Sequence, residues 1–63
     1  MKRLKDFVGQ PVQQVHLALR RAGYDRVLVV EHSEDFPEFI ENGTVLIVLK
    51  ENSGEVVNCF FVG

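Results

Sequence analysis

The chain has almost none of the residues that equip very small proteins with cross-links or metals. Cys59 is the only cysteine, so no disulfide can form within the chain, as is typical of a reducing compartment or of a small fold without cross-links. There is no paired cysteine and histidine spacing for zinc and no glycine-rich phosphate loop. The run with Glu31, His32, Glu34 and Asp35 lacks the spacing and the turn glycine of a calcium loop. We therefore expect no cofactor and no metal.

Long apolar runs are missing as well. No stretch approaches the roughly 18 apolar residues that a membrane-spanning helix needs. Met1–Leu4 is basic, but no apolar segment follows it as in a secretory signal peptide. We expect no membrane association, and the lack of a signal favours a cytoplasmic location.

The length of 63 residues predicts a single domain, covering residues 1–63, that buries only roughly 60% of its unfolded surface. A core leaves little room for a deep pocket, so we expect a protein that binds through its surface and not an enzyme. His32 adjoins Ser33, but neighbouring side chains on an extended chain point to opposite sides. His16 has no carboxylate or cysteine near it in sequence, and we interpret it as a histidine at the rim of the core.

The net charge is only −2, but the acidic residues are concentrated in one stretch. Five of the nine lie within residues 31–43, and no lysine or arginine occurs between Arg26 and Lys50. Phosphate backbones would be repelled by such a segment, so nucleic-acid binding is not expected. A basic patch on a protein partner would suit it better, although an acidic loop can also serve solubility alone.

Hydrophobic periodicity predicts a small α+β fold. Proline in a first turn, apolar residues at helical spacing and a closing glycine predict a helix from Gln10 to about Ala22. Its apolar face comprises Val12, Val15, Leu19 and Ala22. Three β-branched runs predict strands, the last two forming an antiparallel hairpin: 26–30, 44–49 and 55–62. We expect the helix to cover one face of this sheet, and Met1–Asp6 to be frayed or loosely packed.

The stretch Glu31–Gly43, between the first two strands, is the feature around which the chain is organised. Long connections without an element of their own are uncommon in compact domains and are usually functional or disordered. A competing interpretation starts from Asn42-Gly43, the strongest short hairpin signal. In that case Glu38–Glu41 would fold back as a further strand onto Thr44–Ile47.

The order of these parts resembles the potato inhibitor I family of serine-protease inhibitors, the group of eglin and barley chymotrypsin inhibitor. Residues 4–12, LKDFVGQPV, resemble the opening of that family, which runs Leu-Lys, an aromatic or similar residue, then Val-Gly before the helix. Tyr24-Asp25 before the first strand, Val56-Val57-Asn58 in the last strand and the closing Val62-Gly63 are also similar. The resemblance covers nearly the whole chain.

The resemblance implies a mixed sheet in which the two strands flanking a long exposed loop run parallel. It also implies that the loop offers a bond to a serine protease, near Pro37-Glu38 or Glu38-Phe39. The expected contact residues are Phe36, Pro37, Glu38 and Phe39, with Glu34, Asp35 and Ile40 beside them.

The chain departs from the family pattern at the start of the second strand. Family members commonly carry arginines there that brace the loop, whereas the corresponding positions here are near Gly43 or Thr44, and Leu46. Two hypotheses therefore stand: a serine-protease inhibitor, and a non-inhibitory module whose loop binds a basic protein partner through its aromatic and acidic residues. Apolar strands could also expose an edge, so the chain is expected to be a monomer or an edge-paired dimer.

Overall fold

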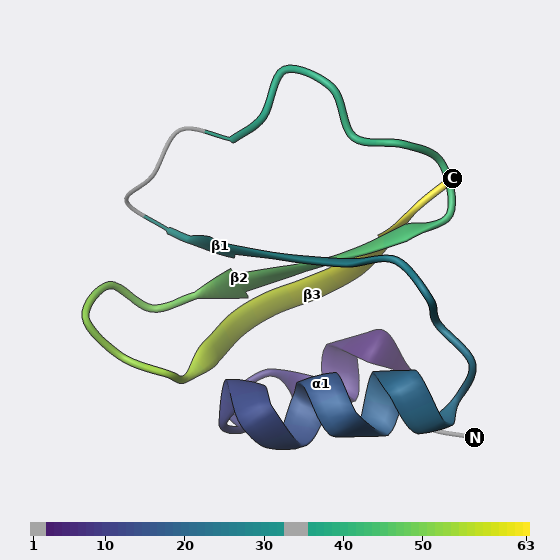
Figure 1. Ribbon diagram of the computed structural model, residues 1–63. Helices are drawn as coiled ribbons and strands as arrows, with labels where there is room; N and C mark the ends of the chain where they lie inside the picture. Colours follow the sequence, from purple (N-terminus) through teal and green to yellow (C-terminus); the bar gives the residue numbers. More distant parts are fainter. Residues whose placement is uncertain (1–2, 33–35) are drawn as a thin grey trace.

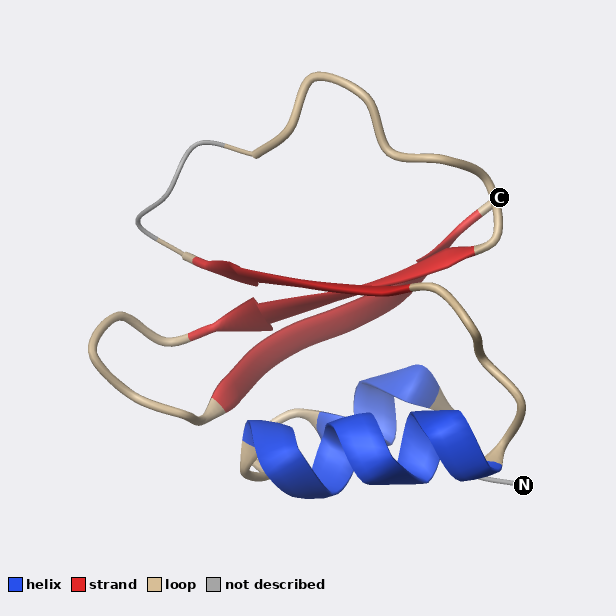
Figure 2. Ribbon diagram, viewed as in Figure 1, coloured by secondary structure: helices blue, strands red, loops and turns tan. Residues whose placement is uncertain are grey.

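The computed structural model describes residues 3–32 and 36–63 of the chain. A 3-10 helix (η1) precedes one α-helix (α1) and a three-stranded sheet in the order β1-β2-β3. β1 pairs with β2 in parallel, and β2 pairs with β3 antiparallel. The predicted α+β fold, one helix packed on a small mixed sheet, is confirmed (Figures 1 and 2). The elements are η1 Leu4–Phe7, α1 Val12–Arg21, β1 Val27–Glu31, β2 Thr44–Leu49 and β3 Val56–Val62.

Helix α1 begins and ends close to its predicted limits. Pro11 is its N-cap residue, in an extended conformation with a φ of −64°. At the other end Gly23 adopts a φ of +94°. The Tyr24 N–H donates to the Leu19 carbonyl over 3.1 Å and the Gly23 N–H to the Arg20 carbonyl over 3.1 Å, which is the Schellman arrangement that glycine favours. These bonds end the helix and turn the chain toward β1.

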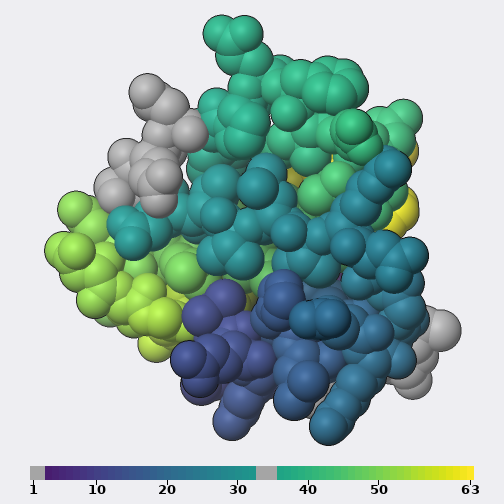
Figure 3. Space-filling view, in the orientation of Figure 1, coloured from purple at the N-terminus to yellow at the C-terminus, as the bar shows by residue number. Residues whose placement is uncertain are grey.

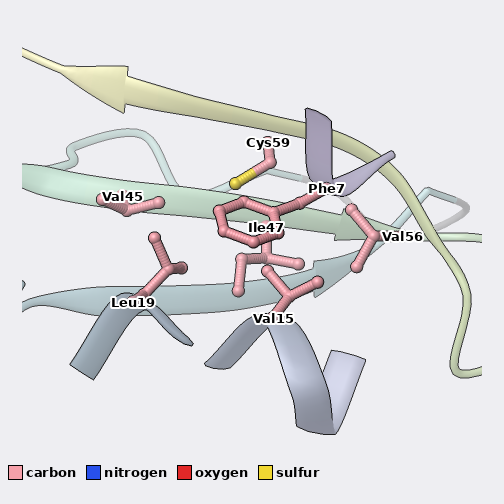
Figure 4. Close-up of a cluster of buried hydrophobic side chains, with 7 residues drawn as sticks. All are labelled: Phe7, Val15, Leu19, Val45, Ile47, Val56 and Cys59. Atoms are coloured by element: carbon pink, nitrogen blue, oxygen red, sulfur yellow. The ribbon is translucent and has the colours of Figure 1, made fainter. Parts of the chain in front are cut away.

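The main core lies between α1 and the sheet (Figure 4). Val15 and Leu19 are fully buried as predicted, while Ala22, expected on the same face, is exposed because it already belongs to the helix end. Burial raises the pKa of the Cys59 thiol in this core, so the thiol is neutral and inert. The buried side chains of this cluster are Phe7, Val15, Leu19, Val45, Ile47, Val56 and Cys59.

Of the two expectations for the N-terminal segment, fraying is wrong for residues 4–6, whereas Lys5 and Asp6 are exposed, as loose packing implies. Leu4–Phe7 forms η1, and only 6% of the Phe7 surface is exposed. The segment is fixed to β3, because the Gly9 N–H donates to the Val56 carbonyl over 2.7 Å. A single aromatic residue without periodicity gives no secondary-structure signal, so its burial could be found only from the packed fold.

The opposite face of the sheet has its own buried cluster, formed by Val30, Leu46 and Val48. No helix of the described chain lies on this side. Instead the described part of the connection between β1 and β2, residues 36–43, arches over it (Figure 1). Ile40 packs against the cluster. The molecule therefore has three layers, with α1 and the connection on opposite faces of the sheet. Within residues 3–32 and 36–63 no helix is long and apolar enough to cross a membrane.

Candidate functional site

The connection between β1 and β2 is the candidate site, and the parallel pairing of these strands dictates its form. Val27 pairs with Val45 and Glu31 with Leu49, so the chain leaves one end of the sheet and must return to the other. That distance is roughly 17 Å for a five-residue strand. Parallel strands usually make this return through a helix. Here residues 36–41 belong to neither helix nor strand, and the chain bends at Glu38.

The competing hairpin interpretation is wrong. β2 lies at the centre of the sheet, with β1 on one side and β3 on the other. Both of its hydrogen-bonding edges are therefore occupied, and Glu38–Glu41 cannot pair with it. Asn42 and Gly43 do form a turn, but this turn leads from the connection into β2. Gly43 has a φ of +92°, a conformation that glycine adopts without strain.

Both ends of the connection are held by backbone hydrogen bonds. At its beginning the His32 N–H donates to the Leu49 carbonyl over 2.7 Å. At its end the Gly43 N–H donates to the Val62 carbonyl over 2.6 Å, and the Thr44 N–H donates to the Glu41 carbonyl over 3.3 Å. The connection is thus fixed to β2 at one end and to the last residues of β3 at the other.

An ion pair between side chains also holds the end of the connection that leads into β2. The Arg26 Nη1 lies 2.6 Å from the Glu41 Oε2, and both side chains are about 60% exposed. Sequence reasoning missed this brace, because it sought a basic residue at the start of β2. The basic residue is instead Arg26, directly before β1. The parallel pairing of β1 and β2 brings it to this place, and its carbonyl accepts the Val45 N–H over 2.9 Å. An exposed ion pair of this kind contributes at most about 1 kcal/mol.

The predicted contact residues differ in exposure. Phe39 is 78% exposed and Phe36 is 47% exposed, and Pro37 and Glu38 between them are also exposed. Ile40 points the other way and packs on the outer-face cluster, so it anchors the connection. We call the exposed stretch Phe36–Phe39 the loop apex; the connection that carries it forms the green ridge of Figure 3.

Two predicted site residues, Glu34 and Asp35, lie outside the residues that the structure describes, as does Ser33 beside His32. Among the described residues no group of three or more histidine, cysteine or acidic side chains could hold a metal ion. The loop apex therefore offers two aromatic rings, a rigid proline, a carboxylate and accessible main chain. These groups suit contact with another protein.

No known family matches the chain, and no curated protein matches it at a significant level.

Proposed function

We propose that the protein inhibits a serine protease by presenting the loop apex, Phe36–Phe39, as a substrate. The observation that carries this proposal is an exposed stretch of main chain fixed at both ends to adjacent parallel strands. The resemblance of the sequence to the potato inhibitor I family supports the same function. A loop held in its bound conformation loses little conformational entropy on binding, which favours tight association.

The attachments on both sides of the apex give a reason for slow net cleavage. After hydrolysis the new C-terminal end would remain held through the bond between His32 and Leu49. The new N-terminal end would remain held by Ile40 on the sheet and by the ion pair of Glu41. Both ends would remain tethered to the same sheet, so the bond could be re-formed at a high effective concentration.

The position of the bond decides which protease is inhibited. A bond at Glu38-Phe39 places an exposed carboxylate before the cleaved bond and requires a protease with a basic specificity pocket. A bond at Pro37-Glu38 requires a pocket that accepts proline. We favour Glu38-Phe39, because the chain bends at Glu38 and Phe39 is the most exposed of the large apolar side chains described.

The test is an inhibition panel with glutamate-specific, proline-specific, chymotrypsin-like and trypsin-like serine proteases. We expect inhibition of the glutamate-specific enzyme at submicromolar concentration and a single cut at Glu38-Phe39 by mass spectrometry after long incubation. Glu38→Gln should abolish this inhibition, whereas the matched variant Glu51→Gln, on an exposed turn, should not. Rapid digestion of the loop, or no inhibition of any enzyme at micromolar concentration, would contradict the proposal.

A second candidate function is a non-inhibitory module that binds a basic protein partner. The observation in its favour is that Phe39 is 78% exposed beside Glu38, which has no ion-pair partner among the described residues. Its binding should weaken strongly with salt and with Glu34→Lys combined with Glu38→Lys. Association that does not depend on salt would argue against it.

A further inference from the structure

Strand β1 is an edge of the sheet, and half of its backbone groups face away from β2. In a parallel pair alternate residues bond to the neighbouring strand. The Arg26 carbonyl accepts a hydrogen bond from β2, and the His32 N–H donates one to β2. The backbone groups of the even-numbered residues between them therefore face β2. The N–H and C=O groups of Val27 and Val29 therefore point outward. Neither residue has a backbone partner on that side within the described chain, and the Val29 side chain is 40% exposed.

Two depressions lie on either side of this edge. The first, between β1 and α1, is lined by His16, Arg20, Tyr24, Asp25 and Val27. The second lies between β1 and the connection and is about as polar as it is apolar. It is lined by Asp25, Arg26, Val27, Leu28, Phe39, Ile40, Glu41 and Thr44. In Figure 3 the teal side chains of β1 lie between the blue helix below and the green connection above. The two depressions therefore flank the first residues of β1, Val27 and Leu28, one on the helix side and one on the connection side.

We propose that the edge of β1 binds an extended peptide segment of a partner protein as a fourth strand. Outward N–H and C=O groups offer main-chain hydrogen bonds to such a segment, and side pockets select its side chains. Successive side chains of a strand point to opposite faces. One set would therefore enter the depression beside α1, and the other set would enter the depression beside Ile40.

The two depressions define the chemistry of the segment. The depression on the connection side has an apolar part at Leu28, Phe39 and Ile40. Its charged pair, Arg26 and Glu41, is already matched, and the carboxylate of Asp25 at its end disfavours an acidic ligand side chain there. It would take an aliphatic side chain. The depression on the helix side contains Arg20, which has no ion-pair partner among the described residues. It would take an acidic side chain, placed toward Arg20 and away from Asp25. The ligand is a strand in which aliphatic and acidic residues alternate.

A second copy of the chain fits this edge less well. Antiparallel pairing of two β1 strands into one continuous sheet would place both connections on the same face of that sheet. The exposed carboxylates of Glu38 in the two copies would then lie on that one face. Like charges brought together in this way oppose association.

The binding test uses a short capped peptide in which valine and glutamate alternate, added to the native protein. We expect saturable shifts of the Val27 and Val29 amide signals and slower hydrogen exchange of both amides. N-methylation of single peptide residues should abolish binding at every second position only, because only alternate N–H groups would face β1. A peptide alternating valine and lysine should bind more weakly. Equal sensitivity at all positions, or no binding, would overturn the proposal.

Two variants of the protein locate the contact. Val29→Pro removes one outward N–H without removing a bond to β2, and edge strands accept proline. Binding should be lost. Arg20→Glu should weaken binding about threefold to fivefold, since an exposed ion pair contributes up to about 1 kcal/mol. The matched control Arg21→Glu carries the same charge change in the same helical turn, outside the depression, and should bind as the native protein does.

The remaining outcomes are also decisive. If Val29→Pro fails to fold, the N-methylation pattern measures the same pairing on the native protein. Sedimentation experiments measure whether the protein dimerises. If the native protein is a dimer and Val29→Pro is the one variant that is monomeric, the β1 edge binds a second copy of the chain and the peptide proposal is wrong. The proposal does not depend on protease inhibition. Glu38→Gln should leave peptide binding unchanged, and Val29→Pro should leave inhibition unchanged.

Discussion

Replacing Ile40 by alanine tests whether the connection is part of the folded core. Ile40 is half-buried against the cluster of Val30, Leu46 and Val48, so the substitution removes apolar surface and leaves a gap. A fully buried isoleucine changed to alanine costs roughly 2–5 kcal/mol, and partial burial lowers this to about 1–2 kcal/mol. A domain of this length has a total stability of only roughly 3–9 kcal/mol. The expected loss is therefore a large fraction of the whole.

The assay is urea and thermal unfolding followed by circular dichroism. A loss of about 1–2 kcal/mol corresponds to a lower Tm by roughly 4–16 °C for a domain of this size. Phe39→Ala is the matched control: it removes a larger apolar side chain from the neighbouring position, but that side chain is 78% exposed. It should change stability by less than about 0.5 kcal/mol. Equal effects of the two variants, or no effect of Ile40→Ala, would show that the connection does not pack on the sheet.

Three further predictions concern the attachments of the connection and the core. In Gly43→Ala the added methyl group meets no atom within 4 Å, but alanine must adopt a φ of +92°. The free energy of unfolding in urea should therefore fall by about 1–2 kcal/mol; an unchanged midpoint would show that the turn does not require glycine. A double-mutant cycle with Arg26→Gln and Glu41→Gln should give a coupling below about 1 kcal/mol that disappears in high salt; a large, salt-independent coupling would contradict the exposed geometry. Cys59 should react with iodoacetamide only as fast as the protein unfolds, because burial excludes the reagent and raises the thiol pKa; fast labelling of the native protein would contradict this.

The elements themselves could be predicted from local sequence. The apolar spacing of Val15 and Leu19 fixes the helical face, and Gly23 marks the end of the helix. The β-branched run Thr44–Leu49 gave the bounds of β2 without error. These features depend on side-chain shape and backbone preference within a few residues, so they are legible without knowledge of the fold.

The candidate site could be predicted only in part from the sequence. The family resemblance implied that Phe36–Phe39 lie on an exposed loop, and the structure places all four residues at the surface. The inward direction of Ile40 and the brace from Arg26 were not predicted, because both depend on which strand lies next to which. Asn42-Gly43 indicated a turn correctly, but the pairing partner that local chemistry suggested was wrong.

The sequence by itself determined one helix, three strands and a long acidic connection that contains aromatic residues. Only the tertiary structure decided what that connection does: it closes the outer face of the sheet through Ile40, and it is fixed at its end by Val62. The tertiary structure also places β1 at the edge of the sheet, with a depression on each side. The physical reason is that local preferences act over a few residues, whereas strand order depends on burying both faces of β2 at once. That requirement joins residues far apart in the chain, and no short segment encodes it.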